Sequence, residues 1–84
     1  MPEADPRKAT NLLRRRLLKN PRDVEALLAL ASQLEAAGQV QEAETLSRKA
    51  HRFAPAAPQP LWILGRILQL QGRYDDALAI ADTA

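Results

Sequence analysis

The 84-residue sequence is poor in the residue types that mark many other protein classes. It has no cysteine, which excludes disulfide bonds and thiolate metal sites. It has only three glycines and one each of Trp, Tyr and Phe, and β-branched residues are scarce. Leucine and alanine dominate, which favours helix over strand. At this length we expect one small domain.

The groups that catalysis needs are also sparse. His51 is the only histidine, and it has no histidine or glutamate four residues further on and no serine placed for a catalytic triad. The sequence has no glycine-rich phosphate loop. We therefore predict that the chain is not an enzyme and binds neither a metal nor a cofactor.

Charge and hydropathy exclude a membrane protein. Twelve basic and ten acidic residues leave a net charge of +2, too small to indicate nucleic-acid binding. The first 20 residues resemble no signal peptide, and no apolar run reaches the roughly 18 residues of a membrane span. These features predict a soluble, cytoplasmic protein.

The most informative feature present is an internal repeat with a period of 34 residues. Residues 21–50, placed over residues 55–84, are identical at seven positions, namely Pro21/Pro55, Leu27/Leu61, Leu30/Leu64, Leu34/Leu68, Gly38/Gly72, Ala43/Ala77 and Ala50/Ala84. Helix packing and tight turns need these residue types. A period of this length is typical of stacked helical hairpins, which mostly bind other proteins.

Apolar spacing and turn residues predict five helices. We expect them at about 6–19, from about Arg22 to just before Gly38, at 40–53, at 60–71, and from Tyr74 onward. Residues 1–5 are expected to form a flexible leader. The rest forms one domain with three segments. Residues 6–20 are expected to be the second helix of a partial repeat, and residues 21–54 to be a complete repeat. Residues 55–84 are expected to be a second repeat that is truncated at its C-terminal side.

The repeated positions resemble those of the tetratricopeptide repeat family. They are Leu27, Leu30, Ala31, Leu34, Gly38 and Ala43, and again Leu61, Leu64, Gly65, Leu68, Gly72 and Ala77. The resemblance implies an all-α fold of about two and a half repeats, with antiparallel helix hairpins stacked as a short right-handed α-solenoid. The small residues at Ala31 and Gly65 should let helices approach closely, and Gly38 and Gly72 should permit left-handed turns.

The sequence departs from the family pattern, for example at Leu27 and Leu61, where the family often has tryptophan. Ser47 stands where a large apolar residue is usual, which predicts a loosely filled spot. Three prolines between residues 55 and 60 predict an unusual angle for the second hairpin.

The resemblance implies a protein-interaction scaffold whose concave groove is lined by the first helix of each hairpin and holds a peptide or a partner helix. The expected groove residues are Leu28, Ser32, Trp62, Ile63, Arg66 and Gln69, together with Glu25, Glu35 and Gln59. Trp62 and Arg66 are four apart, so they share a helix face, and both residue types are common in binding hot spots. The alternative is that Trp62 packs on a neighbouring hairpin and Arg66 is a solvated charge.

One subset of the family binds the acidic C-termini of heat-shock chaperones through lysine, asparagine and arginine side chains. The corresponding positions here are Leu28, Ser32, Trp62 and Arg66, of which only Arg66 is basic. We therefore exclude that class of partner.

A second expected surface is self-association. The helix at 60–71 is apolar around most of its circumference, and the last helix leaves apolar residues without a cover in the sequence. Leu70, Leu78 and Ala81 are the expected contacts of a homodimer or higher oligomer. The alternative is that the five helices bury these side chains by themselves.

Two other functions stay open at this point. The chain could be the N-terminal regulatory or assembly segment of a larger enzyme. Alternatively, it could be an RNA-binding helical repeat that uses Arg14, Arg15, Arg16 and, one period later, Arg48, Lys49 and Arg52. For these basic residues we favour a solubilising outer face, so nucleic acid is an unlikely partner.

Overall fold

The computed structural model describes residues 6–83 and the side chains of residues 8–80, and the predicted leader at residues 1–5 lies outside this range. Within it the chain forms five helices and no strand. They are α1 (Pro6–Lys19), α2 (Val24–Ala36), α3 (Val40–Phe53), α4 (Gln59–Leu70) and α5 (Tyr74–Thr83). This confirms the predicted all-α fold. The second helix begins two residues later than expected, because Asp23 is its N-cap.

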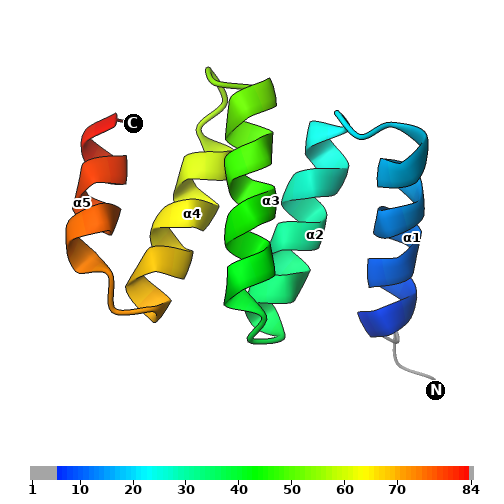
Figure 1. Ribbon diagram of the computed structural model, residues 1–84, viewed down its shortest axis with the longest axis horizontal. Coiled ribbons are helices and arrows are strands. Elements are labelled where there is room, and N and C mark those ends of the chain that lie inside the picture. The colour runs from blue at the N-terminus through cyan, green and yellow to red at the C-terminus, as the bar shows by residue number, and fades with distance from the viewer. Residues whose placement is uncertain (1–5, 84) are drawn as a thin grey trace.

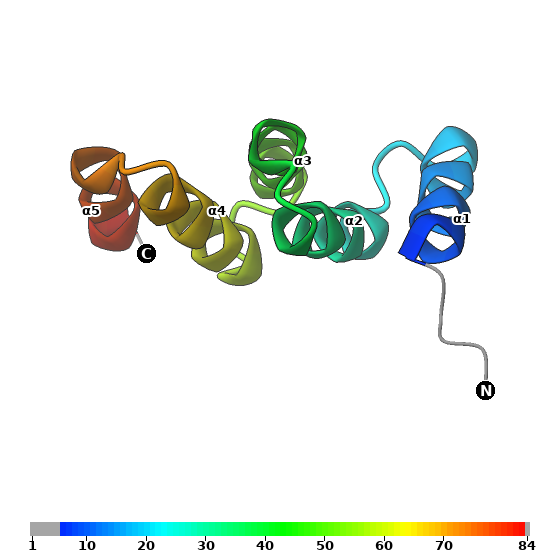
Figure 2. The same ribbon diagram turned by 90° about the horizontal axis from the view of Figure 1, so that it is seen from below.

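Successive helices run antiparallel, side by side along the long axis of the molecule (Figure 1). The described chain extends over 41 × 26 × 19 Å. α2 also contacts α4, so the first helices of the two hairpins form one layer. α3 lies on the other side of this pair (Figure 2). α1 and α5 stand at the two ends of the row.

Both hairpin turns use the predicted glycines. Gly38 and Gly72 have φ values of 85° and 74°, in the left-handed region that favours glycine. The amide of Gln39 donates to the carbonyl of Leu34, and the amide of Arg73 donates to the carbonyl of Leu68, each at 2.8 Å. In addition, the amide of Gly38 donates to the carbonyl of Glu35, and the amide of Gly72 donates to the carbonyl of Gln69. These two hydrogen bonds per turn define a Schellman motif. The turns thus repeat with the period of the sequence.

The hydrophobic core runs from the first hairpin into α4. Its largest cluster consists of buried residues from α2, α3 and α4, namely Leu27, Leu30, Ala31, Leu34, Ala43, Leu46, Ala50 and Ile67. A smaller cluster joins α4 to α5 through Leu64, Leu68 and Ala77. Each helix therefore buries its apolar stripe against its neighbours along the chain.

The structure describes the surroundings of two small residues, Ser47 and Gly65. The predicted loose spot at Ser47 is a fully buried position, and its hydroxyl donates to the carbonyl of Ala43 at 2.9 Å, so the polar group is satisfied within α3. The expectation that Gly65 permits a close helix approach is wrong. A Cβ atom at Gly65 would meet no atom within 4 Å, because no helix covers this part of α4.

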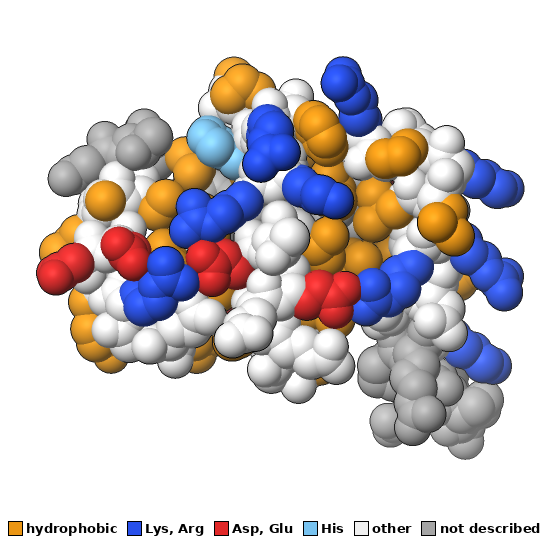
Figure 3. Space-filling model, viewed as in Figure 1, with side chains coloured by type: hydrophobic (Ala, Val, Ile, Leu, Met, Phe, Trp, Pro, Cys, Tyr) orange, Lys and Arg blue, Asp and Glu red, His pale blue; other side chains and the backbone are white. Residues whose placement is uncertain are grey.

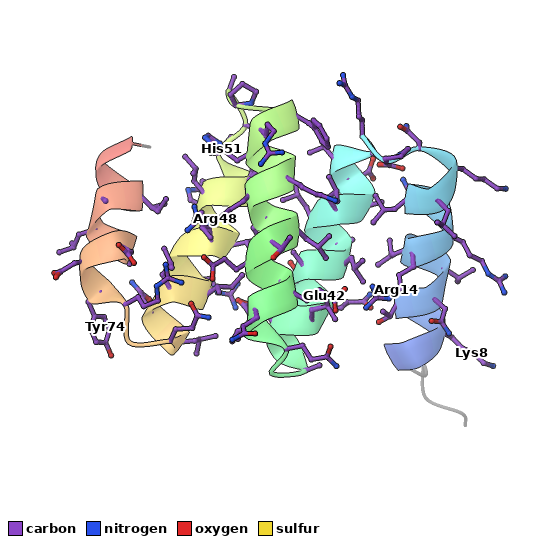
Figure 4. All side chains as sticks on the ribbon, viewed as in Figure 1. Lys8, Arg14, Glu42, Arg48, His51 and Tyr74 are labelled. Carbon is purple, nitrogen blue, oxygen red and sulfur yellow. The ribbon has the colours of Figure 1, made fainter. Side chains whose placement is uncertain are left out.

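Ion pairs on the α3 face link α3 to α1 and to the turn between α4 and α5. Arg14 of α1 and Glu42 of α3 point toward one another, with 2.7 Å between nitrogen and oxygen (Figure 4). The hydrogen bond from Arg14 lowers the pKa of Glu42. Burial raises the pKa of Glu44, but its bonds from Arg48 and Arg73 outweigh this effect and the net shift is downward. These carboxylates are therefore held in the charged form.

Candidate interaction surface

The predicted groove residues divide into an exposed set and a packed set. Ser32, Trp62, Arg66 and Gln69 are exposed. Leu28 and Ile63 are half-buried, because they pack against the core cluster of the first hairpin. The most exposed part of the predicted groove therefore lies on α4.

The helical spacing of α4 brings Trp62, Arg66 and Gln69 onto one face. They are separated by four and three residues, which places each one turn after the last. The indole of Trp62 is not packed on a neighbouring hairpin, since this residue is 62% exposed. An exposed tryptophan offers a large apolar area for a partner to cover.

This face opens into a surface pocket of about 260 Å³ between α4 and α5. The pocket is lined by Leu61, Trp62, Gly65, Arg66, Gln69, Ala77 and Ile80. Arg66 is the only charged residue among them. Sequence reasoning assigned Leu61, Gly65 and Ala77 to repeat packing and counted Ile80 among the uncovered apolar residues of the last helix, so it did not identify the pocket that they line together.

Arg66 is anchored by a carboxylate of the first hairpin. Its Nη2 lies 3.0 Å from Oε1 of Glu35, whose side chain is only 6% exposed. The expectation that Glu35 faces the groove is therefore wrong. The ion pair with Arg66 satisfies Oε1 of Glu35, whereas its Oε2 is buried without a hydrogen-bond partner among the described residues. The Arg66 side chain remains 69% exposed, so part of its guanidinium can still bind an acceptor.

Two of the residues predicted for self-association are exposed. Leu70 of α4 and Leu78 of α5 are both about two-thirds exposed, as is Tyr74. The side chain of Ala81 lies outside the described residues. Five helices thus leave several large apolar side chains uncovered within residues 8–80, which contradicts the alternative that they bury them all.

The comparison with protein families agrees with the geometry of the hairpins. A family model described as tetratricopeptide repeat matches residues 24–49 and 58–83, two segments that begin 34 residues apart. The chain belongs to the tetratricopeptide repeat family. The two matches correspond to the hairpins α2–α3 and α4–α5, and α1 precedes the first of them. Comparison with curated proteins gave no match.

Tetratricopeptide repeats are generally protein–protein interaction modules and typically serve as non-enzymatic scaffolds. Among the described residues, none of the helices is long and apolar enough to cross a membrane. The same residues contain no group of three or more histidine, cysteine or acidic side chains that could hold a metal ion.

On the face with α1 and α3, basic side chains of the described residues alternate with acidic ones. Figure 3 shows Lys and Arg side chains dispersed over α1 and α3, with acidic side chains between them. Arg14 and Arg48 are paired with Glu42 and Glu44, and Arg16 is paired with Asp23. Pairing of this kind lowers the positive potential that a phosphate backbone would meet, which weighs against an RNA-binding surface.

Proposed function

We propose that this tetratricopeptide repeat protein is a non-enzymatic, cytoplasmic interaction module. Its binding surface comprises the predicted groove residues Leu28, Ser32, Trp62, Ile63, Arg66 and Gln69. The observation that carries the proposal is the exposure of Trp62 at the edge of a pocket whose floor is apolar. An aromatic anchor beside such a pocket is typical of interface hot spots.

The chemistry of the surface indicates what it binds. Leu28 and Ile63 are half-buried and pack against the core, so they offer apolar surface at fixed positions. Trp62 and the pocket beside it would bind an apolar side chain of the ligand. Arg66 retains donors beyond its bond to Glu35, and these suit a carboxylate or a backbone carbonyl. The surface therefore fits an extended peptide or a partner helix with apolar side chains and an acceptor beside them.

A peptide-display library panned against the purified chain tests this function. We expect enriched peptides whose affinity falls at least about tenfold for Trp62→Ala, the loss of one aromatic hot spot. The matched control is Leu12→Ala, because Leu12 is similarly exposed but lies on α1. Circular dichroism would confirm that both variants remain folded.

Two results would contradict the proposal. One is that no peptide is enriched above background. The other is that the enriched peptides bind wild type, Trp62→Ala and Leu12→Ala with equal affinity, which would place the binding surface elsewhere on the chain.

We also propose that the chain self-associates through exposed apolar residues of α4 and α5, with Leu70, Leu78 and Ala81 as the predicted contacts. The exposed side chains of Leu70 and Leu78 support this proposal.

A further inference from the structure

A second surface pocket lies between α1 and α3, toward the other end of the row of helices from the pocket at Trp62. It has a volume of about 360 Å³ and is lined by Arg14, Leu17, Leu18, Leu30 and Leu46. Figure 3 shows hydrophobic side chains in this gap between the two helices. None of the lining residues belongs to the binding surface proposed above, so this pocket is a separate candidate site.

The accessible apolar area of the α1–α3 pocket comes mainly from Leu18. Leu30 and Leu46 are buried at its floor, and Leu17 is half-buried because it packs against the core of the first hairpin. Leu18 is 82% exposed, more than any other large hydrophobic side chain among the described residues. A leucine in this setting gives a partner an apolar area to cover.

Helix packing does not require an apolar side chain at the position of Leu18. The residue 34 positions later is Arg52, which holds the equivalent place near the end of α3. Arg52 is exposed, so the repeat accommodates a charged side chain there. The exposure of Leu18 is therefore better explained by a partner than by the fold.

Two contacts mark the ends of this pocket along the helices. Arg14 of α1 pairs with Glu42 of α3 across the gap, as Figure 4 shows. Further along, the guanidinium of Arg22 lies 5.3 Å from the ring centroid of Phe53, the last residue of α3. The lining leucines of α1 and α3 lie between these two contacts in the sequence. A pocket bounded in this way suits a bulky side chain of a short segment.

The rim of the pocket is positively charged. Arg15 lies one turn before Leu18 on α1. Lys49 lies one turn after Leu46 on α3. Both cations are exposed, and neither they nor Arg22 make an ion pair within the described residues.

The acidic residues of the neighbouring elements do not neutralise this rim. Four carboxylates of α2, its N-cap and α3 are paired with arginines other than those of the rim, namely Asp23, Glu35, Glu42 and Glu44. Glu25 makes no ion pair within residues 8–80, but its spacing places it on the side of α2 that bears Leu28 and Ser32. The unpaired cations of the rim therefore attract negative charge to the pocket.

We propose that the α1–α3 pocket binds a short acidic segment of a partner protein. A bulky apolar side chain of the segment contacts Leu18, and flanking Asp or Glu side chains face Arg15 and Lys49. An apolar centre with complementary charges around it is typical of a specific protein interface. RNA fits less well, because it has no aliphatic side chain to cover Leu18. This site goes beyond the proposed function, since it does not involve Trp62.

Panning a peptide-display library against the Trp62→Ala variant tests this site apart from the first surface. We expect enriched peptides that combine Leu, Ile or Phe with adjacent Asp or Glu, because both parts of the pocket then have a partner. One enriched peptide, synthesised with a fluorescent label, serves as the probe in anisotropy titrations. Enriched peptides without acidic residues, or no enrichment, would overturn the proposal.

The apolar contact is tested by Leu18→Glu. This variant should raise the dissociation constant of the probe at least about tenfold, because it removes the apolar contact and repels the acidic flanks. The matched control is Leu12→Glu, since Leu12 is an exposed leucine of the same helix that does not line the pocket. Circular dichroism would confirm that both variants remain folded. Equal affinities of the two variants would overturn the proposed contact.

The charged rim is tested by Lys49→Glu. This variant should raise the dissociation constant of the probe at least about threefold, because an attraction becomes a repulsion. Lys8→Glu is the control with the same change of net charge, and Lys8 is exposed and points away from α3 (Figure 4). The same loss in both variants would show that only the overall charge matters and would overturn the predicted contact.

The two proposed sites fail in distinguishable ways. Peptides enriched with wild type but not with Trp62→Ala would overturn the α1–α3 site and leave the proposed function standing. Acidic peptides that need Leu18, with no peptide that needs Trp62, would support this site and contradict the first. A single-stranded RNA oligonucleotide that binds wild type but not Lys49→Glu, while no acidic peptide binds, would overturn the acidic segment as occupant.

Discussion

Gly38 and Gly65 occupy backbone conformations with opposite consequences for substitution. Gly38 has a φ of 85°, where any residue with a Cβ is strained even though the space around it is open. Gly65 lies within α4, where glycine is a poor helix former, and a Cβ there would meet nothing within 4 Å. The sequence pattern correctly predicted a left-handed turn at Gly38 but wrongly predicted a close helix approach at Gly65, because it does not show which small residue is covered by a neighbouring helix.

We therefore predict opposite changes in the free energy of unfolding. Gly38→Ala should destabilise the chain by about 1 kcal/mol through backbone strain. Gly65→Ala should stabilise it by about 0.5–1 kcal/mol, because alanine loses less conformational entropy in a helix. Urea denaturation followed by circular dichroism measures both. A destabilising Gly65→Ala would show that the space beside Gly65 is filled.

The helices themselves follow from local signals, whereas the contacts between them do not. Apolar periodicity and the turn glycines predicted the five helices, since each signal acts within one or two turns. The pairing of Arg14 with Glu42 spans 28 residues and depends on how α1 and α3 lie relative to α2. The burial of Glu35 and the pocket at Trp62 likewise depend on hairpin packing, so sequence spacing did not reveal them.

At the scale of the elements, the Arg14–Glu42 pair should make stability depend on pH. Arg14 lowers the pKa of Glu42 in the folded chain below its unfolded value. A carboxylate shifted in this direction contributes stability above its unfolded pKa, and this contribution is lost as pH falls through the folded pKa. Wild type should therefore lose stability as pH falls from about 5 to about 3.

Two substitutions isolate this contribution. Glu42→Gln should flatten the decrease of unfolding free energy with falling pH, because the amide does not titrate. Glu25→Gln serves as control, since Glu25 is exposed and makes no ion pair within the described residues, and it should leave the slope as in wild type. Equal slopes for Glu42→Gln and wild type would contradict a role for the pair.

At the scale of the whole molecule, α4 contributes both to the core and to an exposed surface. Its inner side chains, such as Ile67, complete the core of the first hairpin, and its outer side chains form an open surface with α5. A solenoid buries each hairpin against the next, and in the described residues the corresponding surface of α4 and α5 is open. In this protein that surface contains the only tryptophan of the chain.

The most direct test of the account is the fluorescence emission of Trp62 during titration with a peptide selected from the library. Because Trp62 is the only tryptophan, its emission reports this surface alone. Binding should shift the emission to shorter wavelength as the indole leaves water, with the same dissociation constant as calorimetry gives. Peptide binding that leaves the emission of Trp62 unchanged would contradict the claim that this surface is the binding site.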